Sequence, residues 1–136
     1  MIKASCLCNK IEFEAEEVPG MTFNCHCSRC KKSHGAAFST QFIADIKSLK
    51  ILKGEQYLSE YHSPKAIRTF CSHCGARLMN YDPKKASYLS VSVSALDHPQ
   101  GFRPTGECFA PEKLEFITLD PSIPHYQELP KIEAAP

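Results

Sequence analysis

The sequence has little net charge and no long apolar run. The first argues against general binding to nucleic acid or membrane surfaces, and the second argues against a membrane-spanning helix. A formal net charge of +1 gives no general attraction to nucleic acid or to a membrane surface, so such a partner would need a local patch. No apolar stretch approaches the roughly 18 residues that a membrane-spanning helix needs. We therefore expect no membrane association and no nucleic-acid partner.

An export signal is also missing. Residues 1–5 have no apolar core of the kind found in signal peptides. The chain nevertheless contains eight cysteines, and in a reducing compartment such cysteines bind metal more often than they form disulfides. We expect a cytoplasmic protein whose cysteines are metal ligands.

No internal repeat, long amphipathic helix or linker divides the 136 residues, which is the usual length of one domain. Alternation of apolar and polar side chains predicts a mainly β fold with a single short helical turn over residues 28–34. We expect one domain over residues 1–120, followed by a mobile, proline-containing C-terminal tail over residues 121–136.

The predicted strands begin with residues 11–16, where Ile11, Phe13 and Ala15 alternate with glutamates up to a Pro19–Gly20 turn. Residues 49–52 and 57–61 are predicted to pair as a hairpin across Lys53–Gly54. Further strands are expected over residues 37–43, 66–70, 78–81, 88–95 and 114–119.

The densest chemistry lies in residues 25–35, which hold Cys25, Cys27 and Cys30 together with two histidines and three cations. Three thiols so close together cannot all pair as disulfides, because a disulfide needs a defined separation of its Cα atoms. One soft cation can bind all three as thiolates. This pattern indicates a three-thiolate metal site with one position left open.

Four other cysteines predict a second, closed site. Cys71-x-x-Cys74-Gly75 has the form of a zinc knuckle, in which glycine takes the left-handed backbone that closes the turn. Cys6-x-Cys8 is too short to bind one ion from a straight strand, so the chain is expected to bend there, and Asn9 tolerates a left-handed conformation. Two pairs together make a Cys₄ zinc site.

Structural readings of the same residues remain open. Cys25, Cys27 and Cys30 would form a second structural zinc site if His26, His34 or Cys108 supplied a fourth ligand. Cys108 alone is most simply a small buried hydrophobic residue.

The order of motifs resembles the glutathione-dependent formaldehyde-activating enzyme family, which includes the centromere protein V group. The resemblance covers about residues 3–120. It rests on Ser5-Cys6-Leu7-Cys8, Cys25-His26-Cys27-Ser28-Arg29-Cys30-Lys31-Lys32, Gly35-Ala36, Phe70-Cys71-Ser72-His73-Cys74-Gly75, Ala95-Leu96-Asp97 and Phe102-Arg103-Pro104.

This resemblance implies a β-tent fold of antiparallel sheets and two Zn²⁺ ions per chain. One is a structural zinc on Cys6, Cys8, Cys71 and Cys74, and the second is held by Cys25, Cys27 and Cys30. It also implies a carbon–sulfur lyase that, in reverse, condenses formaldehyde with glutathione to S-hydroxymethylglutathione. The chain departs from the family's usual pattern by having Asn9 in place of glycine, no histidine in residues 105–109 and no tryptophan in residues 114–116.

The chemistry of the open site also favours a thiol ligand. Three thiolates on Zn²⁺ leave a net charge of about −1, which suits a soft sulfur ligand better than water activation. Arg29, Lys31 and Lys32 are the expected contacts for a carboxylated thiol such as glutathione, and His26 and His34 the expected proton carriers. The alternative function is a non-enzymatic zinc module that binds a protein or nucleic acid.

Overall fold

The computed structural model describes residues 1–130, and nearly all regular structure in this part of the chain is β. The elements are β1 (Ile2–Ser5), β2 (Glu12–Cys25), α1 (Ser28–His34), β3 (Ser39–Lys53), η1 (Glu55–Tyr57), β4 (Leu58–His62), β5 (Ile67–Cys71), β6 (Arg77–Tyr81), β7 (Leu89–Ser92), η2 (Val93–Ala95), β8 (Gly106–Cys108) and η3 (Ala110–Glu112). The mainly β fold and the short helical turn are confirmed.

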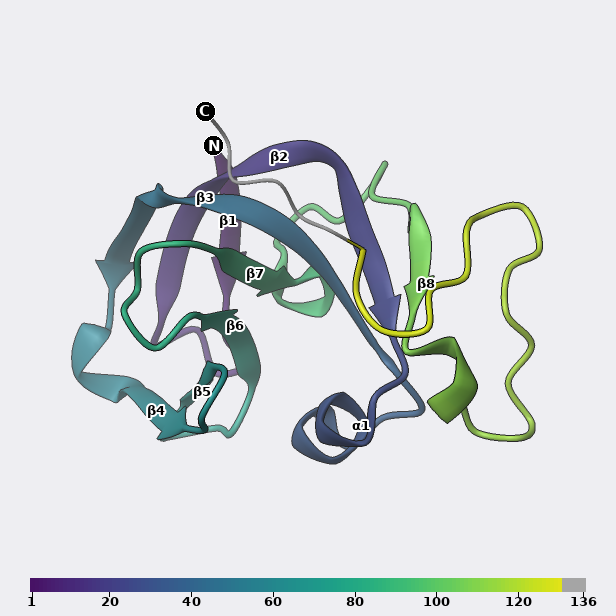
Figure 1. The fold of residues 1–136 in the computed structure, drawn as a ribbon. Coiled ribbons are helices and arrows are strands. Elements are labelled where there is room, and N and C mark those ends of the chain that lie inside the picture. The colour runs from purple at the N-terminus through teal and green to yellow at the C-terminus, as the bar shows by residue number, and fades with distance from the viewer. Residues whose placement is uncertain (131–136) are drawn as a thin grey trace.

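The strands form one curled sheet in the order β1-β2-β3-β7-β6-β5-β4, in which all neighbours are antiparallel (Figure 1). The short strand β8 lies outside this path and pairs in parallel with the end of β2, so that Cys108 lies beside Cys25. The helix α1 follows β2 directly and crosses beneath the sheet (Figure 1). No helix among residues 1–130 is both long and apolar enough to cross a membrane.

The strand β2 is longer than the alternating pattern predicts, because it does not end at Pro19–Gly20. Irregular pairing with β3 between Glu17 and Thr22 accommodates these two residues, and Gly20 takes a φ of 77° there. The strand then continues to Cys25. This continuation delivers Cys25 to the start of the metal-binding stretch.

The predicted hairpin between residues 49–52 and 57–61 is wrong. Gly54 has a φ of 76° and lies so close to Lys10 that a Cβ atom would stand 1.8 Å from the Lys10 carbonyl oxygen. The chain turns through η1 at this point, and β4 then pairs with β5 instead, with Leu58 opposite Cys71. That pairing places Cys71 at the end of a supported strand.

The predicted strand over residues 114–119 is also absent from the described residues, and the segment is irregular. The first part of the expected C-terminal tail forms backbone hydrogen bonds with β8. Glu107 N–H donates to the Pro124 carbonyl at 2.9 Å, and Tyr126 N–H donates to the Glu107 carbonyl at 2.8 Å, so this segment runs beside β8. Residues 131–136, part of the expected tail, lie outside the described residues.

The buried side chains form two clusters. The larger fills the curl of the sheet with residues such as Phe13, Phe42 and Leu78, and it includes Cys6 and Cys71. The smaller cluster contains Cys25, Cys27, Cys30 and Cys108, against which Phe23, Phe109 and Tyr126 pack. Each group of cysteines is therefore part of the packed interior.

Candidate metal centres

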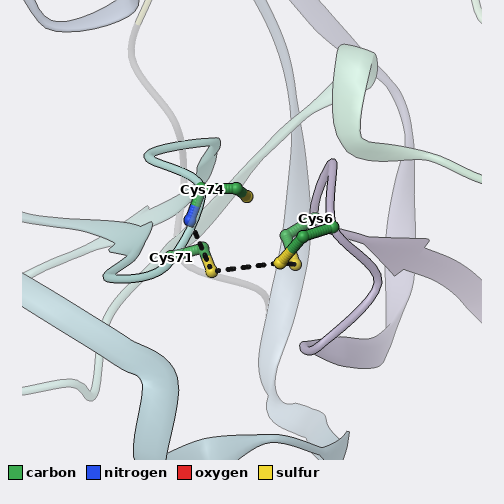
Figure 2. A group of neighbouring side chains, drawn as sticks. Cys6, Cys71 and Cys74 are labelled. Atoms are coloured by element: carbon green, nitrogen blue, oxygen red, sulfur yellow. Dashed lines mark hydrogen bonds between the residues drawn. The ribbon is translucent and has the colours of Figure 1, made fainter.

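Cys6, Cys8, Cys71 and Cys74, which we call the closed cluster, come together where the β1–β2 and β5–β6 loops face each other (Figure 2). The Sγ atoms of Cys6 and Cys8 lie 3.6 Å apart, and those of Cys8 and Cys71 lie 3.8 Å apart. Zn–S bonds of about 2.3 Å in a tetrahedron require sulfur–sulfur separations of about 3.8 Å. The closed cluster therefore has the spacing that Zn²⁺ needs.

The backbone around the closed cluster is bent in the two places that the sequence indicates. Asn9 has a φ of 61° and Gly75 a φ of 78°, both in the left-handed region. These turns allow the Ile11 N–H to approach the Cys6 Sγ at 3.3 Å, and the Cys74 N–H donates to the Cys71 Sγ at 3.5 Å. N–H donors of this kind favour the thiolate form that binds metal.

The acidity of Cys74 reflects this environment. Burial acts to raise the pKa of Cys74, but hydrogen bonds from the backbone at Ala76 and Cys8 and from the Cys71 and Cys8 thiols overcome that effect and lower its pKa to about 6. Metal ligation requires deprotonated sulfur. The sulfur of Cys74 is therefore ready for a cation before one binds.

Cys25, Cys27 and Cys30, which we call the three-cysteine cluster, lie at the junction of β2 and α1. Cys27 is the N-cap of α1, and its Sγ accepts the Cys30 N–H at 3.3 Å, which turns both sulfurs toward one point. The Sγ atoms of Cys25 and Cys27 are 3.5 Å apart. Within residues 1–130, no further histidine, cysteine, aspartate or glutamate atom joins this group.

Of the three-cysteine cluster, Cys30 is the thiol whose pKa is lowered. The Cys25 and Cys27 thiols donate hydrogen bonds to it, and Ser39 and the positive charge of Arg68 act in the same direction, so the pKa of Cys30 lies far below its usual value despite burial. The hydrogen bond to Cys27 is the largest cause of the raised pKa of Cys25. A soft cation would replace these shared protons.

Sequence comparison decides the family. The family model described as "Glutathione-dependent formaldehyde-activating enzyme" matches residues 1–112, which include both groups of cysteines. The chain belongs to this family.

A solved structure has a similar fold. A crystal structure of a Rhodobacter sphaeroides protein superposes with a TM-score of 0.61 at 22% sequence identity, over 90% of this chain and 98% of that one. At this identity the likeness concerns the fold alone. No curated protein matches the chain significantly.

His26, which lies between Cys25 and Cys27 in the sequence, is fully buried. Its Nε2 lies 2.9 Å from Glu107 Oε1, and neither side chain is more than 3% exposed. Glu107 Oε2 accepts the Asp120 N–H at 2.9 Å. Burial acts to raise the pKa of Glu107, but the hydrogen bonds from His26 and Asp120 lower it. The pair joins the three-cysteine cluster to β8, and a proton-carrying role for His26 stays a prediction.

The cations expected to bind substrate lie in different places. Arg29 is exposed, Lys31 Nζ donates to the Glu112 carbonyl at 2.5 Å, and the exposed Lys32 lies beside a cavity together with His34. Burial lowers the pKa of His34.

Sequence reasoning missed three charged residues near the three-cysteine cluster: Glu107, Arg68 and Arg77. The negative charge of a Cys30 thiolate acts on the pKa of Arg77, and the positive charge of Arg68 lowers the pKa of Cys30. Both arginines therefore lie near the Cys30 sulfur. Each of the two arginines lies in a strand beside buried residues. A polar residue in such a strand is only a weak sequence signal, and it does not predict which group the side chain contacts. No sequence pattern predicts that Glu107 meets His26.

Proposed function

We propose that the protein is a zinc-dependent carbon–sulfur lyase of the S-(hydroxymethyl)glutathione synthase type, with its thiol substrate bound at the three-cysteine cluster. The observation that carries this proposal is that this cluster has three converging sulfurs and no fourth histidine, cysteine or carboxylate ligand within residues 1–130. The closed cluster has four, as a structural zinc site requires. Membership of the formaldehyde-activating family supports the class of reaction.

Zinc on three thiolates would supply a soft fourth position that suits a thiolate sulfur. Cys25, Cys27 and Cys30 would hold this ion, and Cys6, Cys8, Cys71 and Cys74 would hold the structural one. The donor set is all sulfur in both cases, which favours Zn²⁺ over hard cations such as Mg²⁺.

The proposed reaction is redox-neutral. In the synthetic direction the thiol sulfur forms a bond to the carbonyl carbon of formaldehyde, the carbonyl π bond breaks, and the thiol proton ends on the new hydroxyl oxygen. The lyase direction reverses these changes. No oxidant, reductant or other reactant is needed, so positioning of the thiol and the aldehyde accounts for most of the expected acceleration.

The protein's own side chains would position the substrate and move the proton. Lys32 and Arg29 are free to contact a carboxylated thiol such as glutathione, whereas Lys31 is already bound to Glu112. His34, which burial keeps uncharged near neutral pH, is the better placed of the two predicted proton carriers because His26 is held by Glu107. Eight free thiols favour a reducing compartment, and we propose the cytoplasm.

Calorimetric titration of the zinc-loaded protein with glutathione and with the neutral thiol 2-mercaptoethanol tests the proposal. We expect glutathione to bind more tightly, because cations surround the cluster. The Cys27→Ala variant should lose one zinc per chain and all thiol binding, while an assay of hemithioacetal formation from formaldehyde should fall to the uncatalysed rate.

The Cys108→Ala variant is the matched control, since it removes a buried thiol that packs beside the same cluster but is not in the ligand group. It should keep both zinc ions and thiol binding. Absence of thiol binding at millimolar concentration, with two zinc ions measured per chain, would contradict the lyase proposal and favour a non-enzymatic zinc module. Thiol binding without formaldehyde turnover would retain the thiol site and reject formaldehyde as the electrophile.

A further inference from the structure

A cavity of about 710 Å³ lies between the two groups of cysteines, and its lining includes Lys32 and His34, two of the substrate contacts proposed above. The last turn of α1 forms one wall with Lys32, Ser33 and His34. The start of β6 contributes Arg77, and the loop between Cys6 and Cys8 contributes the exposed Leu7. The cavity is thus bordered by elements that both clusters hold in place.

Three nitrogen atoms of the cavity residues are buried without a hydrogen-bond partner within residues 1–130. They are Nε2 of His34 and Nε and Nη2 of Arg77. Buried polar atoms in folded proteins nearly always have partners, because an unpaired donor loses its hydrogen bonds to water. Two residues that line one cavity therefore have hydrogen-bonding capacity that the described part of the chain does not use.

The charges around the cavity have the sign that an anion needs. Among the described residues, no carboxylate lies within 4.0 Å of Arg68 or Arg77, although four other ion pairs meet that limit. Arg68 Nη1 donates instead to Ser33 Oγ at 3.2 Å. Burial lowers the pKa of Arg77, and the nearby charge of Arg68 lowers it further, so the two cations repel each other.

The three-cysteine cluster does not cancel this charge. Three thiolates with Zn²⁺ carry a net charge of about −1, whereas Arg68 and Arg77 together carry about +2, so roughly one positive charge remains. Lys32 adds another at the exposed rim.

The guanidinium of Arg77 is also held in a fixed position. Its central carbon lies 5.7 Å from the centre of the Phe70 ring, a separation at which a cation is attracted to the ring face. An arginine fixed in this way can present two parallel N–H groups to a planar or tetrahedral oxyanion.

We propose that this cavity is an oxyanion-binding site that takes a carboxylate or phosphate group, with Arg77 as its principal contact and His34 and Lys32 as additional donors. The anion neutralises the residual positive charge. The site shares Lys32 and His34 with the substrate contacts proposed above, whereas its principal contact, Arg77, has no part in the lyase reaction.

Titration of the ¹⁵N-labelled, zinc-loaded protein with inorganic phosphate and, separately, with acetate tests the proposal by NMR. We expect the Arg77 side-chain Nε–H resonance to move and saturate with at least one of the two anions. Sodium chloride at matched ionic strength corrects for screening. The anion that binds more tightly identifies the group, phosphate or carboxylate, that the site prefers.

Variants then locate the binding. Arg77→Gln should weaken the binding by about tenfold or more, because a charge-assisted hydrogen bond in a partly buried site is lost. Lys50→Gln removes the same charge from an exposed position on β3 and should leave affinity unchanged. Arg77→Lys keeps the charge but loses the two-pronged geometry, so an intermediate affinity supports the proposal.

Two results would overturn it. One is an Arg77 resonance that neither anion shifts beyond the chloride control in the wild-type protein, a measurement that needs no variant to fold. The other is equal anion affinity in the wild type and a folded Arg77→Gln variant, since the anion would then bind elsewhere. Both tests use anions without sulfur, so their failure leaves the proposed thiol chemistry intact, and the reverse also holds.

Discussion

Single residues with unusual backbone angles determine where the sulfurs of the closed cluster point. The Asn9 N–H donates to the Cys6 carbonyl at 3.1 Å, and the Gly75 N–H donates to the Cys71 carbonyl at 2.8 Å, which closes both turns. Asparagine reaches the left-handed region at lower cost than most residues, and glycine at almost none. The cysteine pairs can therefore converge without strain elsewhere in their strands.

At this scale we predict that Cys71→Ser prevents formation of soluble folded protein. Structural zinc contributes about 10–16 kcal/mol to folding in small domains, which equals or exceeds the whole stability of a typical domain. Circular dichroism and metal analysis of the purified variant would check this. A soluble, cooperatively unfolding Cys71→Ser protein with one zinc fewer would contradict the prediction.

The grouping of the cysteines could be predicted from sequence because the spacing within each motif is local. Cys71 and Cys74 lie three residues apart, and the bend after Cys8 follows from the distance that two sulfurs on a strand must close. Arg77 and Glu107 could not be predicted in the same way. Their roles depend on β6 lying near α1 and on β8 lying beside β2, which are contacts between distant parts of the chain.

Among the elements, the loop between β6 and β7 is organised by one carboxylate. Asp82 accepts hydrogen bonds from the backbone N–H groups of Lys84, Ala86, Ser87 and Tyr88. Desolvation acts to raise the pKa of Asp82, but these four donors lower it from 3.8 to about 2. The loop therefore depends on the ionised form.

We predict that Asp82→Asn reduces stability near neutral pH and that this difference shrinks as the pH falls. A carboxylate whose pKa is depressed on folding contributes stability above its unfolded pKa, and that contribution is lost between about pH 4 and pH 2. Urea unfolding of wild type and variant from pH 7 to pH 3 measures the difference. Loss of zinc in acid affects both proteins alike. A difference that stays constant across this range would contradict the prediction.

Strand existence was easier to predict than strand pairing. Alternation located most of the β segments, because burial of one face requires it. The expected hairpin after β3 failed because Gly54 packs against Lys10 and turns the chain away. The apolar residues over 114–119 resemble a strand in sequence, but no neighbouring strand pairs with them in the structure.

On the scale of the whole molecule, the closed cluster joins two parts of the sheet that are far apart in strand order. One pair of its cysteines follows β1, at one edge, and the other pair lies at the end of β5 and in the loop after it, next to the opposite edge. The curl of the sheet in Figure 1 brings these loops together. The three-cysteine cluster instead joins β2, α1 and β8, which lie close to one another along the curl. The domain boundary at residue 120 stays a prediction.

We therefore predict that a mild chelator removes one zinc per chain without unfolding the protein. The three-cysteine cluster has one protein ligand fewer than the closed cluster and should release its ion first. Metal analysis of the dialysed protein, together with its circular dichroism spectrum, measures both quantities. Simultaneous loss of two zinc ions, or unfolding on loss of the first, would indicate that both sites are structural.

The position of β8 also has a consequence for biosynthesis. A ribosome makes the N-terminal residues first, so all four ligands of the closed cluster have been synthesised once residue 74 has been added. Glu107, Cys108 and Tyr126, which cover the three-cysteine cluster, are synthesised well after residue 74. A nascent chain can thus bring the closed cluster together while the thiols of the three-cysteine cluster are still uncovered. Those thiols are most open to oxidation or to the wrong metal during this interval.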